Sequence, residues 1–240
     1  ASDVYKRQEF FKDYICDVGT LLGAAAGQGK NILFEAQLGA LRDIDYGIYP
    51  FTSSSNTIAS YAPIGAGIPG CALDNVVGVM KAYSTCVGEG PFVAETAMGE
   101  AWNEKLRESG GEFGAATGRP RRVGPFDAVA SRYGIRCQKA QDIALTKLDV
   151  LGAFDKIPVI TGYRLHGVLL DSFPTDSRLE EAEPVIEELP GWGCDISGCR
   201  SWRDLPENAR KYVCTLEKLV DHPIYLVSTG AERDAYLLRE

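Results

Sequence analysis

Two short polar segments carry the residue types needed to recognise a purine base. The first, Thr146-Lys147-Leu148-Asp149, closes an apolar run that starts at Ile143. An aspartate carboxylate can accept hydrogen bonds from the ring NH and the exocyclic amine of guanine, whereas adenine leaves it unpaired, which makes such discrimination steep. The Lys147 stem can lie along the base while its ammonium stays solvated. On their own, these four residues favour a strand end with a solvated salt bridge over a base site.

The second segment, Ser228-Thr229-Gly230, follows the apolar run 224–227. Both runs are typical of buried strands, and α/β proteins bind ligands at the carboxyl ends of such strands. The hydroxyls and backbone amides of this segment could meet the guanine carbonyl from the other side. Together, the two segments make a guanine site and a purely structural role equally good interpretations.

A third segment, residues 111–124, holds four glycines and three arginines in a chain whose formal net charge is -8. Glycine lets backbone amides approach an anion, and the arginine fork matches carboxylates and phosphates. We therefore favour an anion site over a solvated basic turn. Nucleic acid is disfavoured, because the chain is acidic and the segment lacks interleaved aromatic residues and an extended basic stripe.

Two glycine motifs resemble phosphate-binding loops without meeting their requirements. Residues 23–30 have the wrong glycine spacing, and Asn31 stands where serine or threonine is needed, so a helix end is expected there. Residues 65–70 match G-x-G-x-x-G, but no clean strand precedes them and Pro69 would interrupt the following helix. Neither motif is assigned a nucleotide.

The seven cysteines are odd in number and scattered, and only two histidines are present, His166 and His222. Structural zinc normally takes four regularly spaced ligands, so we expect no metal site and interpret the cysteines as reduced cytosolic thiols. No run approaches the roughly 18–20 apolar residues that cross a bilayer. We see no secretory signal at the start of the chain, and the expected location is cytoplasmic, with no membrane partner.

Apolar spacing predicts alternating helices and strands, which indicates an α/β fold with a mixed, mainly parallel sheet flanked by helices. Asp204 is a plausible cap for the last helix, and residues 38–70, without sustained periodicity, are expected to be an ordered binding loop. The expected helices span residues 9–26, 73–80, 95–109, 126–133 and 205–219. The expected strands span residues 31–34, 82–87, 143–150, 158–163, 167–170 and 224–227.

From about Glu9 to its end, the chain resembles adenylosuccinate synthetase. The resemblance rests on the three segments above, in that order, and on five further motifs: 34–39 (FEAQLG), 43–51 (DIDYGIYPF), 53–56 (SSSN), 81–85 (KAYST) and 87–92 (VGEGPF). It implies that family's fold, related to P-loop NTPases, with the N-terminal part missing and about the C-terminal half present. Because residues 1–8 precede the resemblance, we predict a non-native remnant there and one domain portion over 9–240.

The resemblance implies an enzyme that joins IMP to L-aspartate in the AMP branch of purine biosynthesis, with GTP as co-substrate and magnesium as cofactor. GTP phosphorylates the 6-oxygen of IMP, and the aspartate amine displaces that phosphate. The residues implied for GTP are Arg121, Lys147, Leu148, Asp149, Ser228, Thr229 and Gly230. Those implied for IMP are Gln37, Leu38, Ser53, Val87 and Arg119. Those implied for aspartate are Ala115, Ala116, Thr117, Gly118, Arg119, Pro120 and Arg121.

Two positions depart from the family pattern. The family's E-G-A-Q-G motif uses its glutamine on IMP, but Leu38 stands at that position and Gln37 lies one residue earlier. Either the loop shifts by one residue or the contact is lost. The aspartate loop usually carries two threonines, whereas here Ala116 precedes Thr117, so one hydroxyl is missing. Ser53 replaces a threonine and keeps its hydroxyl.

The family's catalytic aspartate, its G-D-E-G-K-G phosphate loop, which also binds magnesium, and its catalytic histidine have no counterpart in this sequence. His166 and His222 do not match the catalytic position, and structural or surface roles are expected for them. An arginine that crosses the family's dimer interface is also missing, and a full-length protein is expected to be a homodimer. We expect this chain alone to be inactive. A non-catalytic guanine-nucleotide-binding module remains the alternative.

Overall fold

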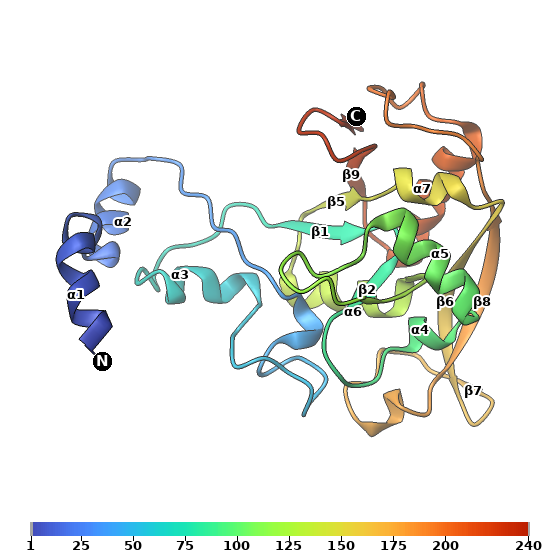
Figure 1. Cartoon of the computed structure of the whole chain (residues 1–240), viewed down its shortest axis with the longest axis horizontal. Coiled ribbons are helices and arrows are strands. Elements are labelled where there is room, and N and C mark those ends of the chain that lie inside the picture. Colours follow the sequence, from blue (N-terminus) through green and yellow to red (C-terminus); the bar gives the residue numbers. More distant parts are fainter. Residues whose placement is uncertain (1, 240) are drawn as a thin grey trace.

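A computed structural model describes residues 2–239, with side chains described from residue 7 onward. Figure 1 shows a body that contains the strands and an N-terminal arm that extends away from it. The α-helices are α1 (Ser2–Phe11), α2 (Val18–Gly27), α3 (Ala62–Gly65), α4 (Val93–Thr96), α5 (Glu100–Gly110), α6 (Ala128–Gln138) and α7 (Glu207–Val220). The 3-10 turns are η1 (Lys12–Tyr14), η2 (Ala40–Arg42), η3 (Ala59–Tyr61), η4 (Asp149–Ala153) and η5 (Ser177–Leu179).

The main sheet has the strand order β1-β5-β9-β10, formed by β1 (Val77–Lys81), β5 (Asp142–Thr146), β9 (Ile224–Ser228) and β10 (Tyr236–Leu238). The first three strands are parallel and β10 is antiparallel to β9. The prediction of an α/β fold with a mixed, mainly parallel sheet is therefore confirmed. Because parallel strands point the same way, the carboxyl ends of β1, β5 and β9 meet at one edge of the sheet.

A second sheet contains β4 (Phe126–Asp127), β6 (Lys156–Leu165), β7 (Val168–Leu169) and β8 (Glu183–Pro190), with β6 in the centre. The long β6–β8 ribbon lies on the side of the body away from the arm (Figure 1). A short antiparallel ribbon joins β2 (Ser84–Cys86) to β3 (Arg122–Gly124). This ribbon links the segment after β1 to the end of the glycine- and arginine-rich segment.

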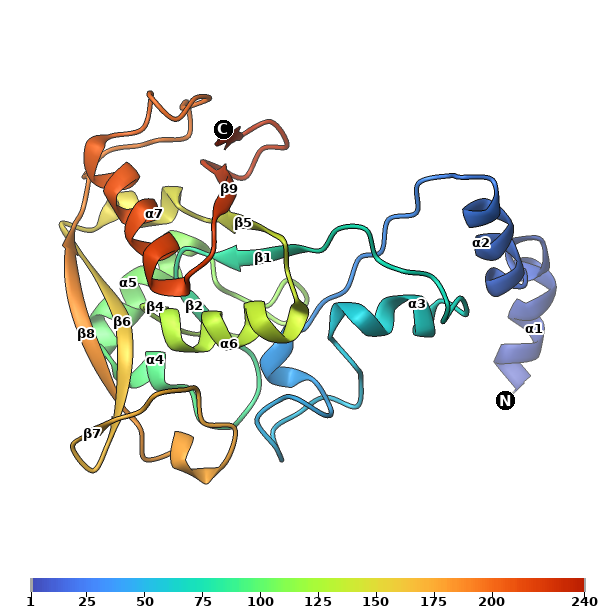
Figure 2. The ribbon, with the colours of Figure 1, turned by 180° about the vertical axis from the view of Figure 1, so that it is seen from behind.

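The main sheet is covered on both faces. Figures 1 and 2 show α5 on one face, with α6 and α7 on the other. Helix α7 buries Ala209, Tyr212, Val213, Leu216 and Val220, which recur at the three- and four-residue spacing of one helical face. The hydroxyl of the fully buried Tyr212 donates to the carbonyl of Ala82, 2.7 Å away. This contact anchors α7 beneath the end of β1.

Several predicted elements differ from the structure in the first part of the chain. The helix expected over 9–26 is broken, because Asp17 accepts a hydrogen bond from the Thr20 amide and starts α2, while Ile15 is extended. The strand expected over 31–34 is absent: this segment pairs with no strand in the described chain, and Leu33 is 94% exposed. Residues 73–80 form no helix, because Val77–Lys81 pair in parallel with β5.

Other boundaries shift by a few residues. The helix expected over 95–109 is divided into α4 and α5, and Gly111, in the left-handed conformation, ends α5 as expected. Helix α6 starts after Asp127, and β8, β3 and β10 were not predicted. Pro206, not Asp204, is the residue before α7; Asp204 instead accepts from the amides of Arg200 and Ser201. The strands expected over 158–163 and 167–170 correspond to β6 and β7, which pair as an antiparallel hairpin.

The two glycine motifs that were set aside do not form nucleotide loops. Residues 23–27 close α2, which is the helix end that was expected, and Gly65 ends the short α3. No helix in the described part of the chain is long and apolar enough to cross a membrane. The assignment of residues 1–8 as a remnant stays a prediction.

The fold contains one buried carboxylate whose titration can be tested. Asp127 is 4% exposed and caps α6 by accepting from the amides of Val129 and Ala130, both at 3.0 Å, and from the Tyr163 hydroxyl. Burial raises the pKa of Asp127 to about 6, against the lowering effect of these bonds. Since the folded pKa lies above the unfolded one, its favourable contribution to stability is complete below the unfolded pKa and is lost as pH rises through about 6.

We therefore expect Asp127→Asn, which stays neutral, to remove a pH-dependent part of the free energy of unfolding. The stability of the unmodified chain relative to the variant should fall by about 1–3 kcal/mol between about pH 4 and about pH 7. Urea denaturation of both proteins across this range measures it. Asp127→Ala, which also removes the helix cap, should cost about 1–2 kcal/mol at every pH. If the two proteins differed in their free energy of unfolding by the same amount at every pH, the raised pKa of Asp127 would be contradicted.

Candidate functional site

The end of β5 turns sharply at the proposed base-binding residues. Lys147 adopts a left-handed conformation with φ of 64°, which is uncommon outside glycine and marks a constrained position. This turn brings the Lys147 ammonium to the carbonyl of Gly110, 2.9 Å away at the end of α5. Leu148 is fully buried below it, and the half-buried Asp149 begins η4. The core thus holds Leu148 while its two charged neighbours remain at the surface.

The end of β9 lies beside this turn. Parallel pairing places Leu145 opposite Val227, so Thr146 and Ser228 follow side by side. Thr229 is fully buried, and its amide and hydroxyl are bonded to the carbonyls of Ala235 and Cys199. Gly230 is half-buried, and a side chain there would press against Ala235, 3.2 Å from the new carbon. The structure therefore brings together the two segments that were expected to enclose guanine.

The glycine- and arginine-rich segment forms a closed loop. Phe113 bridges to Pro120, and the amide of Gly114 donates to the carbonyl of Arg119 at 2.8 Å. Residues 115–120 are all exposed at its tip, and the Thr117 hydroxyl accepts from the amide of Arg119. The expected aspartate-binding residues 115–120 therefore lie together on one projecting loop, with Arg121 half-buried below its tip; the Gly118 and Arg119 amides bond within the loop, to the Gly114 carbonyl and the Thr117 hydroxyl.

A buried carboxylate lies at the base of this loop, and the sequence analysis did not single it out. Glu112 is 1% exposed and accepts from the Lys81 ammonium at 2.8 Å, the Tyr83 hydroxyl at 2.7 Å and the Arg121 guanidinium at 2.8 Å. Lys81 is the last residue of β1 and pairs with Thr146 of β5. Glu112 thus joins the loop to the edge of the sheet where segments 146–149 and 228–230 meet.

The pKa values in this cluster follow from burial and charge. Burial opposes ionisation of Glu112, but the bonds from Lys81, Tyr83 and Arg121 outweigh it, so its pKa lies below the ordinary value. Burial lowers the pKa of Lys81 more than its contact with Glu112 raises it. Burial, followed by the bond to Glu112, raises the pKa of Tyr83, and the charge of Asp149 adds to this rise. Asp149 is therefore close enough to act on the same cluster.

A second set of predicted residues is assembled around Arg42, another residue that the sequence analysis did not name. Its guanidinium donates to the carbonyls of Phe51, Val87 and Glu89 at 2.5, 3.1 and 2.9 Å. Its own carbonyl accepts from the Ser53 amide at 2.8 Å. Arg42 thus holds the segments that carry Ser53 and Val87, two residues expected to contact IMP, against each other.

The position where the family has its glutamine is less closely tied to this set. Leu38 is 57% exposed with φ of 77°, and Gln37 is exposed as well. Only the following residue is held, because the Gly39 carbonyl accepts from the Thr57 hydroxyl at 2.9 Å. Both residues lie just before η2, which contains Arg42.

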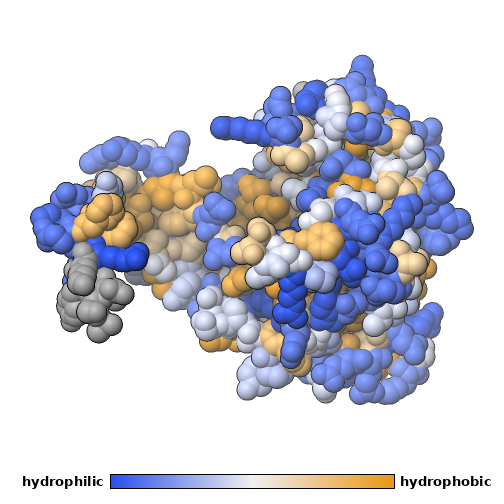
Figure 3. Space-filling model, viewed as in Figure 1, coloured by the Kyte–Doolittle hydropathy of each residue, from blue (hydrophilic) through white to orange (hydrophobic). Residues whose placement is uncertain are grey.

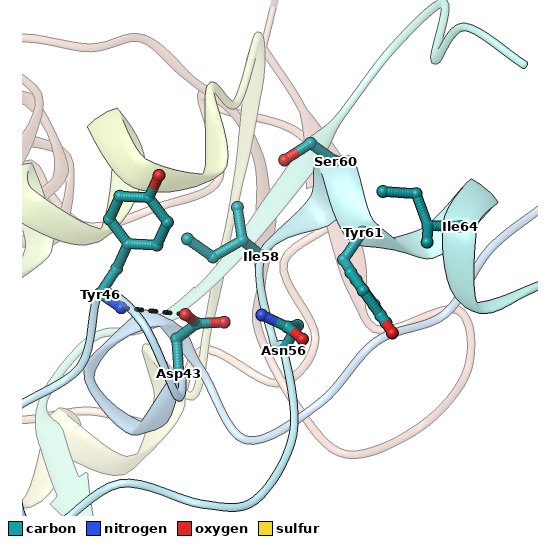
Figure 4. A pocket seen from close by; sticks show the side chains of 7 residues that line it. All are labelled: Asp43, Tyr46, Asn56, Ile58, Ser60, Tyr61 and Ile64. Atoms are coloured by element: carbon teal, nitrogen blue, oxygen red, sulfur yellow. Dashed lines mark hydrogen bonds between the residues drawn. The ribbon is translucent and has the colours of Figure 1, made fainter. Parts of the chain in front are cut away.

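A cavity of about 210 Å³ lies beside this set. Figure 4 shows the side chains that line it, among them Asp43. Asp43 is fully buried and accepts from the amides of Asp45, Tyr46 and Thr57. These three bonds hold the loop 43–57 in its conformation. The cavity is lined by Asp43, Tyr46, Asn56, Ile58, Ser60, Tyr61 and Ile64.

The described residues do not fit a magnesium site. No group of three or more His, Cys, Asp or Glu side chains within residues 2–239 is placed to hold a metal ion. Glu112 is the acidic group at the centre of the cluster, and it already accepts from three donors. His166 lies exposed in the β6–β7 turn and the His222 ring contacts the carbonyl of Gln141, away from the strand ends.

Apolar side chains are exposed along β1 and in the segment that connects the arm to the body. Val79 of β1 is 74% exposed, and Leu33 of the connecting segment is 94% exposed. Figure 3 shows apolar surface where the arm joins the body. Isolated exposed apolar residues are normal, but a stretch along a sheet strand and its neighbouring segment is typical of an interaction surface.

Comparison with known proteins gives a consistent result. A sequence model described as adenylosuccinate synthetase matches residues 1–237. The chain is 49% identical to adenylosuccinate synthetase of Trichlorobacter lovleyi over 96% of its length, and 46% identical to that of Pelotomaculum thermopropionicum over 95%. It covers 53% of each of these relatives, so the chain spans about half the length of the curated relatives it matches.

Solved structures agree. Fully ligated adenylosuccinate synthetase from Plasmodium falciparum superposes with a TM-score of 0.92 at 36% identity, over 98% of this chain and 56% of that one. Succinoaminodeoxyadenylate synthetase of cyanophage S-2L, bound to dGMP and dATP, has a TM-score of 0.50 at 14% identity over 85% of this chain and 45% of that one, which supports the shared fold alone. On the match over nearly the whole chain and the identity to several relatives, the chain belongs to the adenylosuccinate synthetase family.

Proposed function

We propose that the protein to which this chain belongs joins IMP to L-aspartate with GTP, through 6-phosphoryl-IMP, to form adenylosuccinate, GDP and phosphate. Family membership supports the reaction. One observation carries the proposal. The two segments expected to bind guanine, 146–149 and 228–230, meet the Lys81–Glu112–Arg121 cluster at one edge of the main sheet. A base site and a cationic site for phosphates lie side by side there, which is the arrangement that a nucleoside triphosphate needs.

The guanine and the phosphates of GTP would be bound by different groups. The Asp149 carboxylate would accept from the guanine ring NH and amine, with the Lys147 stem along the base and the 228–230 backbone at its carbonyl. The Arg121 guanidinium would contact phosphate oxygens with the N–H groups that Glu112 does not use. The proposed GTP residues are Arg121, Lys147, Leu148, Asp149, Ser228, Thr229 and Gly230.

The other two substrates would lie on the same side of the sheet. The amides of residues 115–117 and the Thr117 hydroxyl would hold aspartate, and Arg119 would face both aspartate and IMP. Ser53 and Val87, held together by Arg42, would form one wall of the IMP site, with Gln37 or Leu38 near it. In this arrangement the 115–120 loop would bring the amine of aspartate to the purine ring of IMP. Arg121 would place the triphosphate of GTP on the other side of that ring.

We propose that the groups that transfer protons are not among the residues described here. Family members bind magnesium and carry a catalytic aspartate and histidine, and the described residues fit neither function. We therefore propose that this chain binds and orients substrates but does not turn over by itself. The exposed apolar surface along β1 supports an association with further protein. A homodimer in the cytoplasm is the proposed form of the complete protein.

The decisive experiment compares this chain with a full-length protein in which the missing half is supplied by a relative. Adenylosuccinate formation from IMP, aspartate and GTP should occur only in the full-length protein. A properly folded full-length protein that fails to form adenylosuccinate would reject the proposal. If it binds GTP without ligation, the non-catalytic guanine-nucleotide module becomes the better description.

Asp149→Asn tests the base site. The neutral amide keeps the size of the side chain but loses the paired acceptor, so the apparent affinity for GTP should fall by about 10-fold or more, while ITP, which lacks the exocyclic amine, should lose less. Titration of both nucleotides with calorimetry measures this. The exposed Asp155→Asn, in the next loop, is the matched control and should change neither affinity. An equal loss for GTP and ITP would argue against contact with the amine.

Ala116→Thr tests the aspartate loop. Because the family usually has a threonine there, its hydroxyl should add one hydrogen bond worth about 1 kcal/mol and lower the KM for aspartate by about fivefold, with the KM for IMP unchanged. Ala115→Thr, at the neighbouring exposed position, controls for bulk and should not lower it. Steady-state kinetics of the full-length protein with aspartate varied will decide, and an unchanged or higher KM would place Ala116 outside the contact.

A further inference from the structure

Glu112 has an unusual position for an acidic residue beside an expected anion site. Its carboxylate is 1% exposed, and the bonds from Lys81, Tyr83 and Arg121 use both of its oxygens. Oε1 accepts from Lys81 and Tyr83, and Oε2 accepts from Arg121. An ionised carboxylate is rarely buried without such partners, because removing its charge from water is costly.

The backbone reinforces the pairing with Arg121. The Arg121 amide donates to the Glu112 carbonyl at 2.9 Å, and the Glu112 amide donates to the Arg107 carbonyl at 2.9 Å. Arg107 closes the arrangement, since its Nε donates to the Arg121 carbonyl at 2.9 Å. Both ends of the loop that carries residues 113–120 are therefore fixed to α5, and Arg121 is held through its main chain and its side chain at once.

We propose that Glu112 is a positioning residue for the triphosphate: its buried carboxylate holds the Arg121 guanidinium and the Lys81 ammonium at the carboxyl end of β1 in the orientation that receives phosphate oxygens. The proposal deepens the proposed function and rests on it for the identity of the nucleotide. It assigns to Glu112 no contact with substrate, because Lys81, Tyr83 and Arg121 surround it.

The charges of the cluster are consistent with this role. The Glu112 carboxylate lies between two cations, so the cluster of Glu112, Lys81 and Arg121 keeps a single net positive charge. The nearby charge of the Lys147 ammonium also lowers the pKa of Lys81. Without Glu112, the two cations would repel each other and move into solvent. With it, they stay in place before a ligand binds, and anion binding then needs little reorganisation.

Free donors remain for the ligand. An arginine has five N–H donors in a fixed fork, and one N–H of the Arg121 Nη1 atom serves Glu112. The Arg121 side chain is 35% exposed and the Lys81 side chain 29% exposed, so each keeps a face toward solvent. The carboxylate therefore fixes each cation from behind, and the opposite faces are available to phosphate.

Glu112→Gln in the full-length protein tests the proposal. The amide keeps the volume, but it offers one acceptor where the carboxylate offered two and points a donor at a cation. We expect the Kd for GTP and for inorganic triphosphate to rise about tenfold or more, while the KM for IMP changes by less than about twofold. Glu112→Asp, which keeps the charge at shorter reach, should recover part of the affinity. A purely structural role would instead lower thermal stability and affect all substrates alike.

A double-mutant cycle separates the two roles. If Glu112 acts through Arg121 and Lys81, the Glu112→Gln change should raise the Kd for triphosphate by a clearly smaller factor when Arg121 is already Ala, with the remaining effect carried by Lys81. Additive effects would overturn the proposal. Asp127→Asn is the matched control, since it also converts a buried carboxylate with three hydrogen bonds to an amide, but in the β4–β6 sheet, and it should leave the Kd for triphosphate unchanged.

The readouts also distinguish this inference from the proposed function. Absence of adenylosuccinate formation in the unmodified full-length protein rejects the reaction but leaves the triphosphate Kd measurable, and the cycle is then read from binding alone. Normal ligation together with an unchanged triphosphate Kd in Glu112→Gln rejects the positioning role and keeps the reaction. Failure of the unmodified protein to bind either GTP or triphosphate rejects both.

Discussion

The parallel alignment of β1, β5 and β9 is the constraint on which the rest of the site depends. Backbone pairing of Lys81 with Thr146, and of Leu145 with Val227, places three strand ends at one edge of the sheet. The ends of β1 and β5 are 65 residues apart in the sequence and those of β5 and β9 are 82 apart, yet the polar residues there become neighbours in the fold. A shift of one residue in either pairing would turn the strand side chains to the opposite face, so the apolar residues that α5, α6 and α7 cover also protect the geometry of the site.

The second requirement is to keep several cations close together in an acidic protein. Lys81 and Arg121 approach the same buried carboxylate, while the Lys147 ammonium is bonded to the end of α5, where backbone carbonyls are unpaired. Each cation is thus held by an acceptor behind it. The acidic net charge of the chain does not prevent local anion binding, because distant surface charges are screened within about 10 Å in salt while these contacts are direct.

The sequence predicted the parts of the site that depend on local patterns. Apolar runs ending in polar residues identified β5 and β9, and glycine density identified the 111–124 loop. The role of Glu112 could not be predicted this way, since two of its partners, Lys81 at the end of β1 and Tyr83 just after it, are distant in the sequence and only the tertiary fold makes Glu112 buried. Its position within the glycine- and arginine-rich segment 111–124 was the available signal. The strand wrongly predicted over 31–34 has a related cause: its three apolar residues favour a strand only when a neighbouring strand exists, and the described chain supplies none. The break before α2 depends on one capping side chain, Asp17, within an otherwise continuous helical pattern.

The proposed IMP wall explains how this chain can differ from its family at individual side chains and still keep the same architecture. The Arg42 guanidinium donates to the carbonyls of Phe51, Val87 and Glu89. The Arg122 guanidinium donates to those of Gly88 and Gly90 at 3.2 and 2.8 Å. Gly90 has a φ of 105° and lies against the Phe51 ring. A side chain at this position would come within 2.5 Å of that ring, so glycine is required there. These contacts use the backbone as the acceptor, so they do not depend on which side chain stands at Leu38 or Ser53. A substitution at those two positions therefore changes one contact with a ligand, whereas loss of Arg42 or Arg122 would release the wall itself.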